Sequence, residues 1–429
     1  MATQFSIREH KPWQARFFTI WGGQAVSIVG TQLVQFALIW YLTVATRSAT
    51  VLATAAMVGT LPQVLLGPFV GTLVDRWDRR RVMILADSII TFFTIVLVLQ
   101  FALNEVTIWQ IYLVMFVRSL AGSFHSNAMN ASTSLLVPVE QLTRIQGLNQ
   151  MLNGGLNVIS APLGALLLGI LPIQGVLLID VGSALFAIVP LCFIRVPQPE
   201  RTAAGQGSVA GQATVWQEFQ AGYRYFLGWP GLLLVGLMTI GINFTIIPAF
   251  SLLPLLVKDF FGGDAVQLSW VESAMGIGML IGGAGLGIWG GFERKMLTSM
   301  LGLMGMGIGT LMMAIAPASA LLLVVAAALC VGIMTPLTMG PFFAVIQSAV
   351  EPGMQARITT LLSSVGGIMA PIGLMIAGPV ADLTGLKTWF FLGGGLCVLM
   401  SVAGLFLPAV MNIEDHPALL KIESQTASH

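Results

Sequence analysis

Four ionisable side chains lie inside otherwise apolar stretches of this sequence: Arg118, His125, Asp180 and Glu272. A charged group inside a membrane is costly unless it is paired or hydrated, so such residues mark functional positions. Imidazole changes its charge near neutral pH, and a carboxyl group in an apolar site can take up and release a proton. We interpret the four as candidates for proton coupling. Arg118 would organise the charges, and either Asp180 or Glu272 would carry the proton.

Each of these residues also has a structural alternative. His125 follows Arg118 by seven residues on the same helical face, and it could instead hydrogen-bond a neighbouring helix. Asp180 and Glu272 could pack against a polar group of another helix or face water at a helix end. Asp87 is close to the start of its apolar stretch, so we expect it at the membrane interface.

The composition identifies the class of protein that holds these residues. The 429 residues are 56% hydrophobic and only 9% charged, whereas roughly a quarter of the residues of a soluble domain are charged. The chain is therefore a multi-pass membrane protein. Its cysteines, Cys192, Cys330 and Cys397, lie in apolar stretches without a pairing pattern, which indicates buried thiols.

The apolar stretches predict an all-α fold with twelve spans, because about 20 apolar residues cross a bilayer. We expect an N-terminal six-helix half over 1–195, a cytoplasmic linker over 196–230, a C-terminal six-helix half over 231–410 and a cytoplasmic tail over 411–429. The spans are 17–42, 51–74, 82–102, 108–131, 143–170, 174–195, 231–257, 266–290, 296–315, 319–346, 357–381 and 388–410.

The basic residues predict the orientation of these spans. With both termini in the cytoplasm, only Arg47, Lys258 and Lys387 fall in outer loops, and Arg118 falls within a span. All other Lys and Arg residues are then cytoplasmic, as the positive-inside rule requires. We therefore expect a plasma or inner membrane protein with both termini inside.

A weak internal repeat supports the two halves. Ala161-Pro162-Leu163-Gly164 in the fifth span recurs as Ala370-Pro371-Ile372-Gly373 in the eleventh, which is the same place in the second half. Repeated halves that enclose a site near the bilayer midplane are typical of transporters.

The loop between the second and third spans carries the most specific motif. Gly71, Leu73, Asp75, Arg76, Arg79 and Arg80 have the spacing of a signature loop, and the sequence resembles the major facilitator superfamily over nearly its whole length. Asp78 departs from the pattern, which usually has Gly there. The resemblance implies that Asp75, Arg76, Arg79 and Arg80 gate the cytoplasmic side, with Asp75 acting as a latch on the conformational change.

Other motifs resemble those of drug antiporters within the superfamily. Arg118-x-x-x-Gly122 is similar to their fourth-span signature, and Gly23-Gln24 with Ser27 and Gly30 is most similar to the macrolide-efflux branch. The resemblance implies proton-coupled export of amphiphilic drugs such as macrolides by alternating access. Export of a specific endogenous compound, such as a siderophore or a lysophospholipid, is one alternative. A non-transporting membrane sensor or assembly subunit is another.

Neutral polar side chains recur at helical spacing on several spans. They either line a cavity or bind helices together. The first and seventh spans line the cavity in the resembled fold, so their stripes are our candidates for substrate contact: Gln24, Ser27, Thr31, Gln35, Thr239 and Asn243. The stripe on the fifth span, Asn149, Asn153, Asn157 and Ser160, stays open between the two roles.

The sequence holds no Walker-type phosphate loop, no His-Glu metal motif and no nucleophile elbow. We therefore expect no enzyme activity, no cofactor and no metal, with the proton gradient as the energy source. We expect the partners to be a small amphiphilic substrate, protons and the lipid bilayer. Nucleic acid is not expected as a partner, and the protein is expected to be a monomer.

Overall fold

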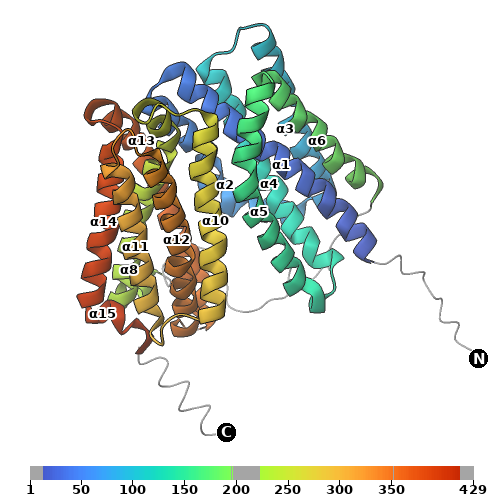
Figure 1. The fold of residues 1–429 in the computed structure, drawn as a ribbon. Helices are drawn as coiled ribbons and strands as arrows, with labels where there is room; N and C mark the ends of the chain where they lie inside the picture. The colour runs from blue at the N-terminus through green and yellow to red at the C-terminus, as the bar shows by residue number, and fades with distance from the viewer. Residues whose placement is uncertain (1–12, 195, 197–222, 351, 416–429) are drawn as a thin grey trace, which may run out of the picture. The chain divides into compact units, whose positions relative to one another are not determined.

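The computed structural model describes residues 13–194, 196, 223–350 and 352–415, and this part of the chain is almost entirely helical (Figure 1). The first long helices are α1 (Trp13–Thr46), α2 (Ala49–Arg76), α3 (Arg79–Ala102), α4 (Ile108–Leu136), α5 (Leu142–Ile170) and α6 (Ile173–Phe193). The later ones are α8 (Pro230–Ser251), α10 (Ala265–Trp289), α11 (Lys295–Ile315), α12 (Leu321–Ala349), α13 (Pro352–Thr384) and α14 (Lys387–Phe406). Short helical segments complete it: η1 (Val139–Gln141), α9 (Leu253–Leu255), η2 (Leu256–Phe260), α15 (Pro408–Met411) and η3 (Ile413–Asp415).

The long helices confirm the predicted all-α membrane fold. Among the described residues, 11 helices are long and apolar enough to cross a membrane. The predicted fourth span, α4, is not one of them, although its 29 residues would be about 43 Å long and exceed the hydrocarbon core. Its polar side chains, which include Arg118 and His125, explain this, because they lower its mean hydropathy.

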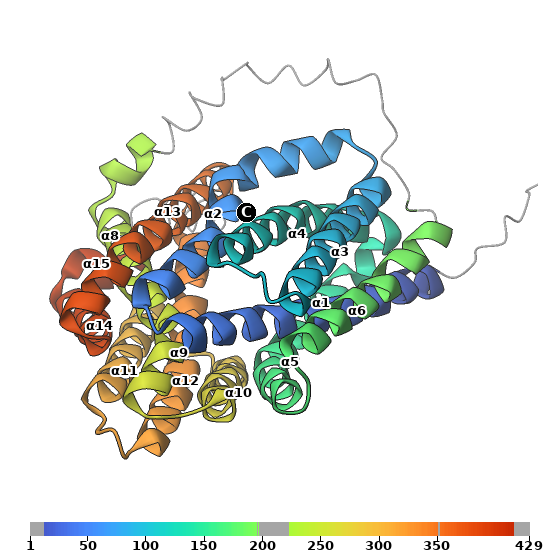
Figure 2. The same ribbon diagram turned by 90° about the horizontal axis from the view of Figure 1, so that it is seen from above.

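The contacts divide the chain into two compact units. In the described part, unit 1 contains 13–37, 65–156 and 167–196. Its helix α3 packs against both α4 and α6 (Figure 2). One of its buried clusters joins α1, α2, α3 and α6 through side chains that include Phe17, Val74, Met83 and Leu191.

Unit 2 contains 38–64, 157–166 and 223–415 of the described residues. In it α12 packs against α10 and α11, and α11 packs against α14 (Figure 1). Glycines bring two of these helices close together. A Cβ at Gly278 or Gly282 would lie 2.9 Å from a backbone Cα of α12, so neither position has room for a side chain. Gly283 and Gly287 face open space.

Asp78 explains how α3 begins. Its side chain accepts a hydrogen bond of 3.0 Å from the backbone N–H of Arg81, which makes it the N-cap of the helix. Aspartate is a favoured N-cap residue, whereas glycine supplies no side-chain acceptor. The departure from the motif at this position therefore has a local structural reason.

Candidate functional site

A buried ion pair lies within unit 1. The Arg118 Nη1 atom is 2.6 Å from Asp180 Oδ2, and the two residues expose only 9% and 2% of their surface. Arg118 Nη1 also donates a 2.5 Å hydrogen bond to the hydroxyl of Thr94. That hydroxyl donates in turn to the Ile90 carbonyl at 2.8 Å. The pair thus joins α3, α4 and α6, and it satisfies a cation and an anion that would each be costly alone.

Glycine allows α1 to approach this ion pair. A Cβ at Gly30 would lie 3.0 Å from both the Cα and the Oδ1 of Asp180. Thr31, the next residue, has its hydroxyl 3.5 Å from Asp180 Oδ1. A second close approach to α6 occurs at Gly23, whose Cβ would press on the backbone of Phe186. The residues that carry the family resemblance on α1 therefore include two that let it pack on α6.

Asp87, which we expected at the membrane interface, is buried inside unit 1. It is only 6% exposed, and its Oδ2 lies 3.6 Å from His125 Nε2 on α4. Helix α3 begins at Arg79, so eight residues, or about 12 Å of helix, separate Asp87 from the helix end. The structure therefore places a second carboxylate, paired with a titratable imidazole, in the same unit as Arg118 and Asp180.

These groups line one cavity of about 410 Å³. Arg118, His125 and Asp87 face it together with Gln24, Ser27 and Thr31 of α1. Gln35 is exposed and does not line it. The volume is within the roughly 300–1,000 Å³ of known ligand pockets. Unit 1 thus contains a polar cavity with ionisable groups on its wall.

The polar stripe of α5 contributes to the same cavity. Asn149 and Asn153 line it, and Asn149 Oδ1 accepts a 2.7 Å hydrogen bond from the indole N–H of Trp21. Asn157 and Ser160 belong to unit 2, where the backbone of Asn157 abuts Gly276 of α10. The first half of the stripe therefore lines the cavity, and the role of the Asn157 and Ser160 side chains stays a prediction.

The basic loop residues bind helix ends inside unit 1. Arg79 Nη1 donates to the Ala131 carbonyl of α4 at 2.7 Å. Arg80 donates to the carbonyls of Leu191 and Cys192 in the last turn of α6, the latter at 2.5 Å. The carbonyls of Leu191 and Cys192 lie in the last turn of α6, where carbonyls lack helical partners and cations are favoured. Two of the predicted gating residues thus bind α4 and the end of α6 in this structure.

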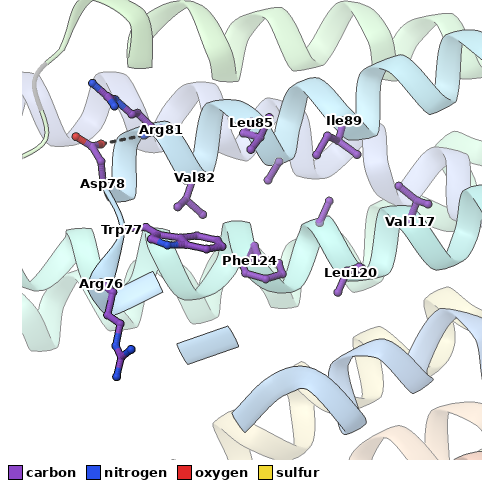
Figure 3. Close-up of a pocket in the computed structure, with 12 residues that line it drawn as sticks. Arg76, Trp77, Asp78, Arg81, Val82, Leu85, Ile89, Val117, Leu120 and Phe124 are labelled. Atoms are coloured by element: carbon purple, nitrogen blue, oxygen red, sulfur yellow. Dashed lines mark hydrogen bonds between the residues drawn. The ribbon is translucent and has the colours of Figure 1, made fainter. Parts of the chain in front are cut away.

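The other two predicted gating residues lie at the end of α2. The side chain of Asp75 is outside the described residues, and Arg76 is exposed. Arg76 lines a second cavity, of about 660 Å³, between α3 and α4, where the rings of Trp77 and Phe124 stack with centroids 6.0 Å apart (Figure 3). The charged residues on the wall of this cavity are Arg76, Asp78 and Arg81. The other side chains that line it are apolar. We therefore regard the smaller, polar cavity as the candidate site.

The remaining predicted residues, Glu272, Thr239 and Asn243, belong to unit 2. Glu272 is half-buried on α10, and none of the ion pairs among the described residues includes it. Asn243 and Thr239 donate to backbone carbonyls of their own helix α8 at 2.9 and 3.0 Å. Both also face Gly366, where a Cβ would lie 3.3 Å from each side chain. They pack α8 against α13 in this structure.

Asp382 of α13 is a functional candidate that the sequence did not reveal. Its carboxylate accepts hydrogen bonds from the backbone N–H groups of Ala49 and Thr50 at 2.8 and 3.1 Å, and from the Thr50 hydroxyl at 2.7 Å. It thereby caps the first turn of α2 within unit 2. Gly378, one turn earlier, permits the approach, because its Cβ would lie 2.5 Å from Thr50 Cα. This junction is at the helix ends predicted to face outside.

Replacing Asp382 with alanine is expected to destabilise this junction. The first N–H groups of α2 would lose their acceptor, and loss of an N-cap costs about 0.5–2 kcal/mol. The apparent unfolding midpoint of the purified protein should therefore fall for Asp382→Ala, and less for Asp382→Asn, which keeps one acceptor oxygen. Asp259→Ala is the control, because Asp259 lies 3.9 Å from an exposed Arg47. Equal midpoints for Asp382→Ala and the control would contradict the capping role.

Comparison with known proteins identifies the family. The sequence profile of the Major Facilitator Superfamily matches residues 20–374. The chain belongs to the major facilitator superfamily. It is 34% identical over 397 residues to macrolide efflux protein A of Streptococcus pyogenes, and the match covers 92% of this chain and 96% of that protein. It is 24% identical to the multidrug efflux pump Tap of Mycolicibacterium fortuitum, with 84% and 87% of the two chains covered.

The solved structures agree on the superfamily fold. A bacterial homologue of the iron transporter ferroportin in the inward-facing state matches with a TM-score of 0.70 and 14% identity, over 95% of this chain and 100% of that one. At that identity the likeness shows the fold alone. The predicted resemblance to the superfamily and to its macrolide-efflux branch is confirmed, and the protein is a multi-pass membrane transporter.

Proposed function

We propose that this protein exports amphiphilic drugs, macrolides among them, in exchange for protons by alternating access. The observation that carries the proposal is the Asp87–His125 pair on the wall of the cavity in unit 1. Its two groups both bind and release protons, and they lie beside a cavity of ligand size. The relatives named for macrolide and multidrug efflux support drugs as the cargo.

The buried ion pair has a different role in this proposal. Asp180 is held by Arg118 at 2.6 Å and is further surrounded by the hydroxyls of Thr31 and Thr94. Its charge is already matched, so it serves to fix the positions of α1, α3, α4 and α6. We therefore assign proton transfer to Asp87 and His125, in place of the Asp180 or Glu272 that the sequence favoured.

Alternating access requires that the two ends of the protein open in turn. We propose that Asp75, Arg76, Arg79 and Arg80 control the cytoplasmic end, as the family motif implies. We propose that the other end is controlled by the contact in which Asp382 caps the first turn of α2. Both termini are cytoplasmic in this scheme, and the working unit is a monomer without a cofactor.

Drug accumulation in efflux-deficient bacteria tests the proposal. Cells that express the wild-type chain should accumulate less of a radiolabelled macrolide than cells with an empty vector, and an uncoupler should abolish the difference. Asp87→Asn and His125→Gln should also abolish it, since each removes a proton-binding group. Glu272→Gln is the matched carboxylate control and should retain export. Immunoblots of the membrane fraction confirm equal expression.

The other outcomes separate the rival functions. If Glu272→Gln loses export and Asp87→Asn keeps it, the carboxylate that carries the proton is Glu272 of unit 2. Export that continues with the uncoupler would exclude proton coupling. If no macrolide or cationic dye is exported, the cargo is not a drug. A siderophore or lysophospholipid would be tested next, and a protein that moves none of these would be a non-transporting subunit.

A further inference from the structure

The larger cavity of unit 1 is separate from the proposed proton and drug site. Its volume is about 660 Å³, and it shares no lining residue with the polar cavity. Helices α3 and α4 lie between the two: Asp87 and His125 face the polar cavity, whereas their chain neighbours Ala86 and Phe124 face the larger one. A volume of this size is within the range of known ligand pockets. The larger cavity is therefore a second candidate site for an organic ligand.

The apolar wall of this cavity continues onto a surface suited to lipid. Leu85 lines the cavity and is 61% exposed. Phe92 and Leu99 follow it at seven-residue intervals on the same face of α3, and they are 61% and 57% exposed. Exposed apolar surface of this extent marks contact with a membrane or with another protein. Because α3 spans the membrane, acyl chains cover this face, and the cavity opens toward them.

The other end of the cavity is positively charged. Figure 3 shows its charged residues together at one end and its apolar side chains along the rest. Arg76 and Arg81 are exposed, and neither takes part in an ion pair within the described part of the chain. The carboxylate of Asp78 caps α3 by accepting the backbone N–H of Arg81. Two positive charges against one negative charge favour an anion at this end.

The predicted orientation places the charged end at the cytoplasmic surface of the membrane. The loop between α2 and α3 is cytoplasmic by the distribution of basic residues. Trp77 of this loop lines the cavity and stacks on Phe124, and tryptophan is enriched at the level of the lipid headgroups. Anionic lipids attract basic residues at the cytoplasmic membrane surface. A ligand with an anionic head and an apolar tail thus matches both ends of the cavity.

We propose that this cavity binds an anionic phospholipid of the inner leaflet, with its phosphate beside Arg76 and Arg81 and an acyl chain along Leu85 and Leu120. A guanidinium group suits phosphate because it presents several N–H donors to the phosphate oxygens. Trp77 and Arg81 are not positions of the family motif, so the motif alone does not imply this site. Binding of the lipid does not depend on the proposed export function.

Native mass spectrometry of the purified full-length protein tests the proposal, because it counts the lipids bound to each protein molecule. The probes are dioleoyl phosphatidylglycerol, which is anionic, and dioleoyl phosphatidylcholine, which has the same acyl chains and no net charge. Wild-type protein should bind its first phosphatidylglycerol at least tenfold more tightly than its first phosphatidylcholine. Arg81→Gln should reduce this preference at least threefold. Arg144→Gln is the matched control and should behave as wild type, since Arg144 is also an exposed arginine at the third position of a helix.

A second pair of variants tests the acyl half of the site. Val117 lines the cavity, whereas Leu113 lies one turn earlier on α4, is exposed and does not line it. Val117→Trp should fill the cavity and weaken binding of the first phosphatidylglycerol at least threefold. Leu113→Trp adds the same ring outside the cavity and should leave binding unchanged. Soluble glycerol phosphate, which has no acyl chain, should not displace the lipid.

Four outcomes would overturn the proposal. Equal affinities of the wild-type protein for the two lipids would exclude an anionic site, and unchanged phosphatidylglycerol binding in either Arg81→Gln or Val117→Trp would exclude this cavity. Displacement of the lipid by glycerol phosphate would show a phosphate site without an acyl groove. Displacement by a macrolide would show that the cavity takes the exported molecule. Circular dichroism of each variant confirms that binding is compared between folded proteins.

Discussion

Replacing Arg118 with alanine is expected to abolish transport and to lower the stability of the folded protein by about 3–5 kcal/mol. The change leaves Asp180, which is 2% exposed, as a buried carboxylate without its cation. It also removes the donor that holds Thr94 of α3. Thermal unfolding of the purified protein, followed together with macrolide export in cells, measures both effects.

A double variant separates charge from packing in this prediction. Arg118→Leu combined with Asp180→Leu replaces the ion pair by apolar side chains, which is often neutral or stabilising. The unfolding midpoint should therefore recover while export stays absent, because the polar cavity has lost the Arg118 side chain from its wall. A single Arg118→Ala variant that unfolds at the wild-type midpoint and exports normally would show that the pair is dispensable.

Replacing Gly282 with valine is expected to disrupt unit 2. A Cβ at this position would lie 2.8 Å from the carbonyl carbon and 2.9 Å from the Cα of Ile333. Since backbone atoms of α12 cannot rotate away, α10 and α12 would have to separate along their whole contact. Overpacking of this kind costs about 1–3 kcal/mol or more. The apparent unfolding midpoint in detergent should fall clearly, and the yield of folded protein should fall with it.

Gly283 provides a matched control for this change. It is the next residue of the same helix, and a Cβ there meets nothing within 4 Å. Gly283→Val introduces the same β-branched residue with the same helix propensity, so it should leave the midpoint almost unchanged. If both variants unfold at the same temperature, the close approach of α10 to α12 does not stabilise the protein.

The sequence was sufficient for the fold because a bilayer imposes a simple rule on length and polarity. Long apolar stretches predict the spans without any knowledge of their packing. Among the long helices of the described residues, α4 alone is too polar to be recognised as a span from its hydropathy. Several of its polar side chains line the cavity. Glycines at four-residue spacing in α10 are typical of close helix contacts. Gly278 and Gly282 make such contacts, whereas Gly283 and Gly287 face open space, and the spacing alone does not distinguish the two pairs.

The pairing of the charged residues could not be predicted in the same way. Arg118 and Asp180 are 62 residues apart and lie on different helices, so no local spacing connects them. The burial of Asp87 depends on contacts with other helices and on where α3 begins, which is at Arg79, three residues before the predicted span. The signal in the sequence for a buried role of Asp87 was its position well inside a helix.

Asp382 shows a second limit of reading a sequence. It lies near the end of α13, where an acidic residue is unremarkable in composition. Its role depends on the first turn of α2, which is 332 residues away in the chain. Only the three-dimensional contact reveals that a carboxylate of one helix supplies the N-cap of another.

The most direct test of the central claim is proton movement in vesicles that contain only the purified protein. An outward macrolide gradient, applied to vesicles loaded with a pH-sensitive dye, should drive protons inward through the wild-type protein. The account predicts an acidification that depends on the macrolide and is absent in Asp87→Asn and in protein-free vesicles. Macrolide that leaves the vesicles without any change in internal pH would contradict proton exchange, whatever the cell assays show.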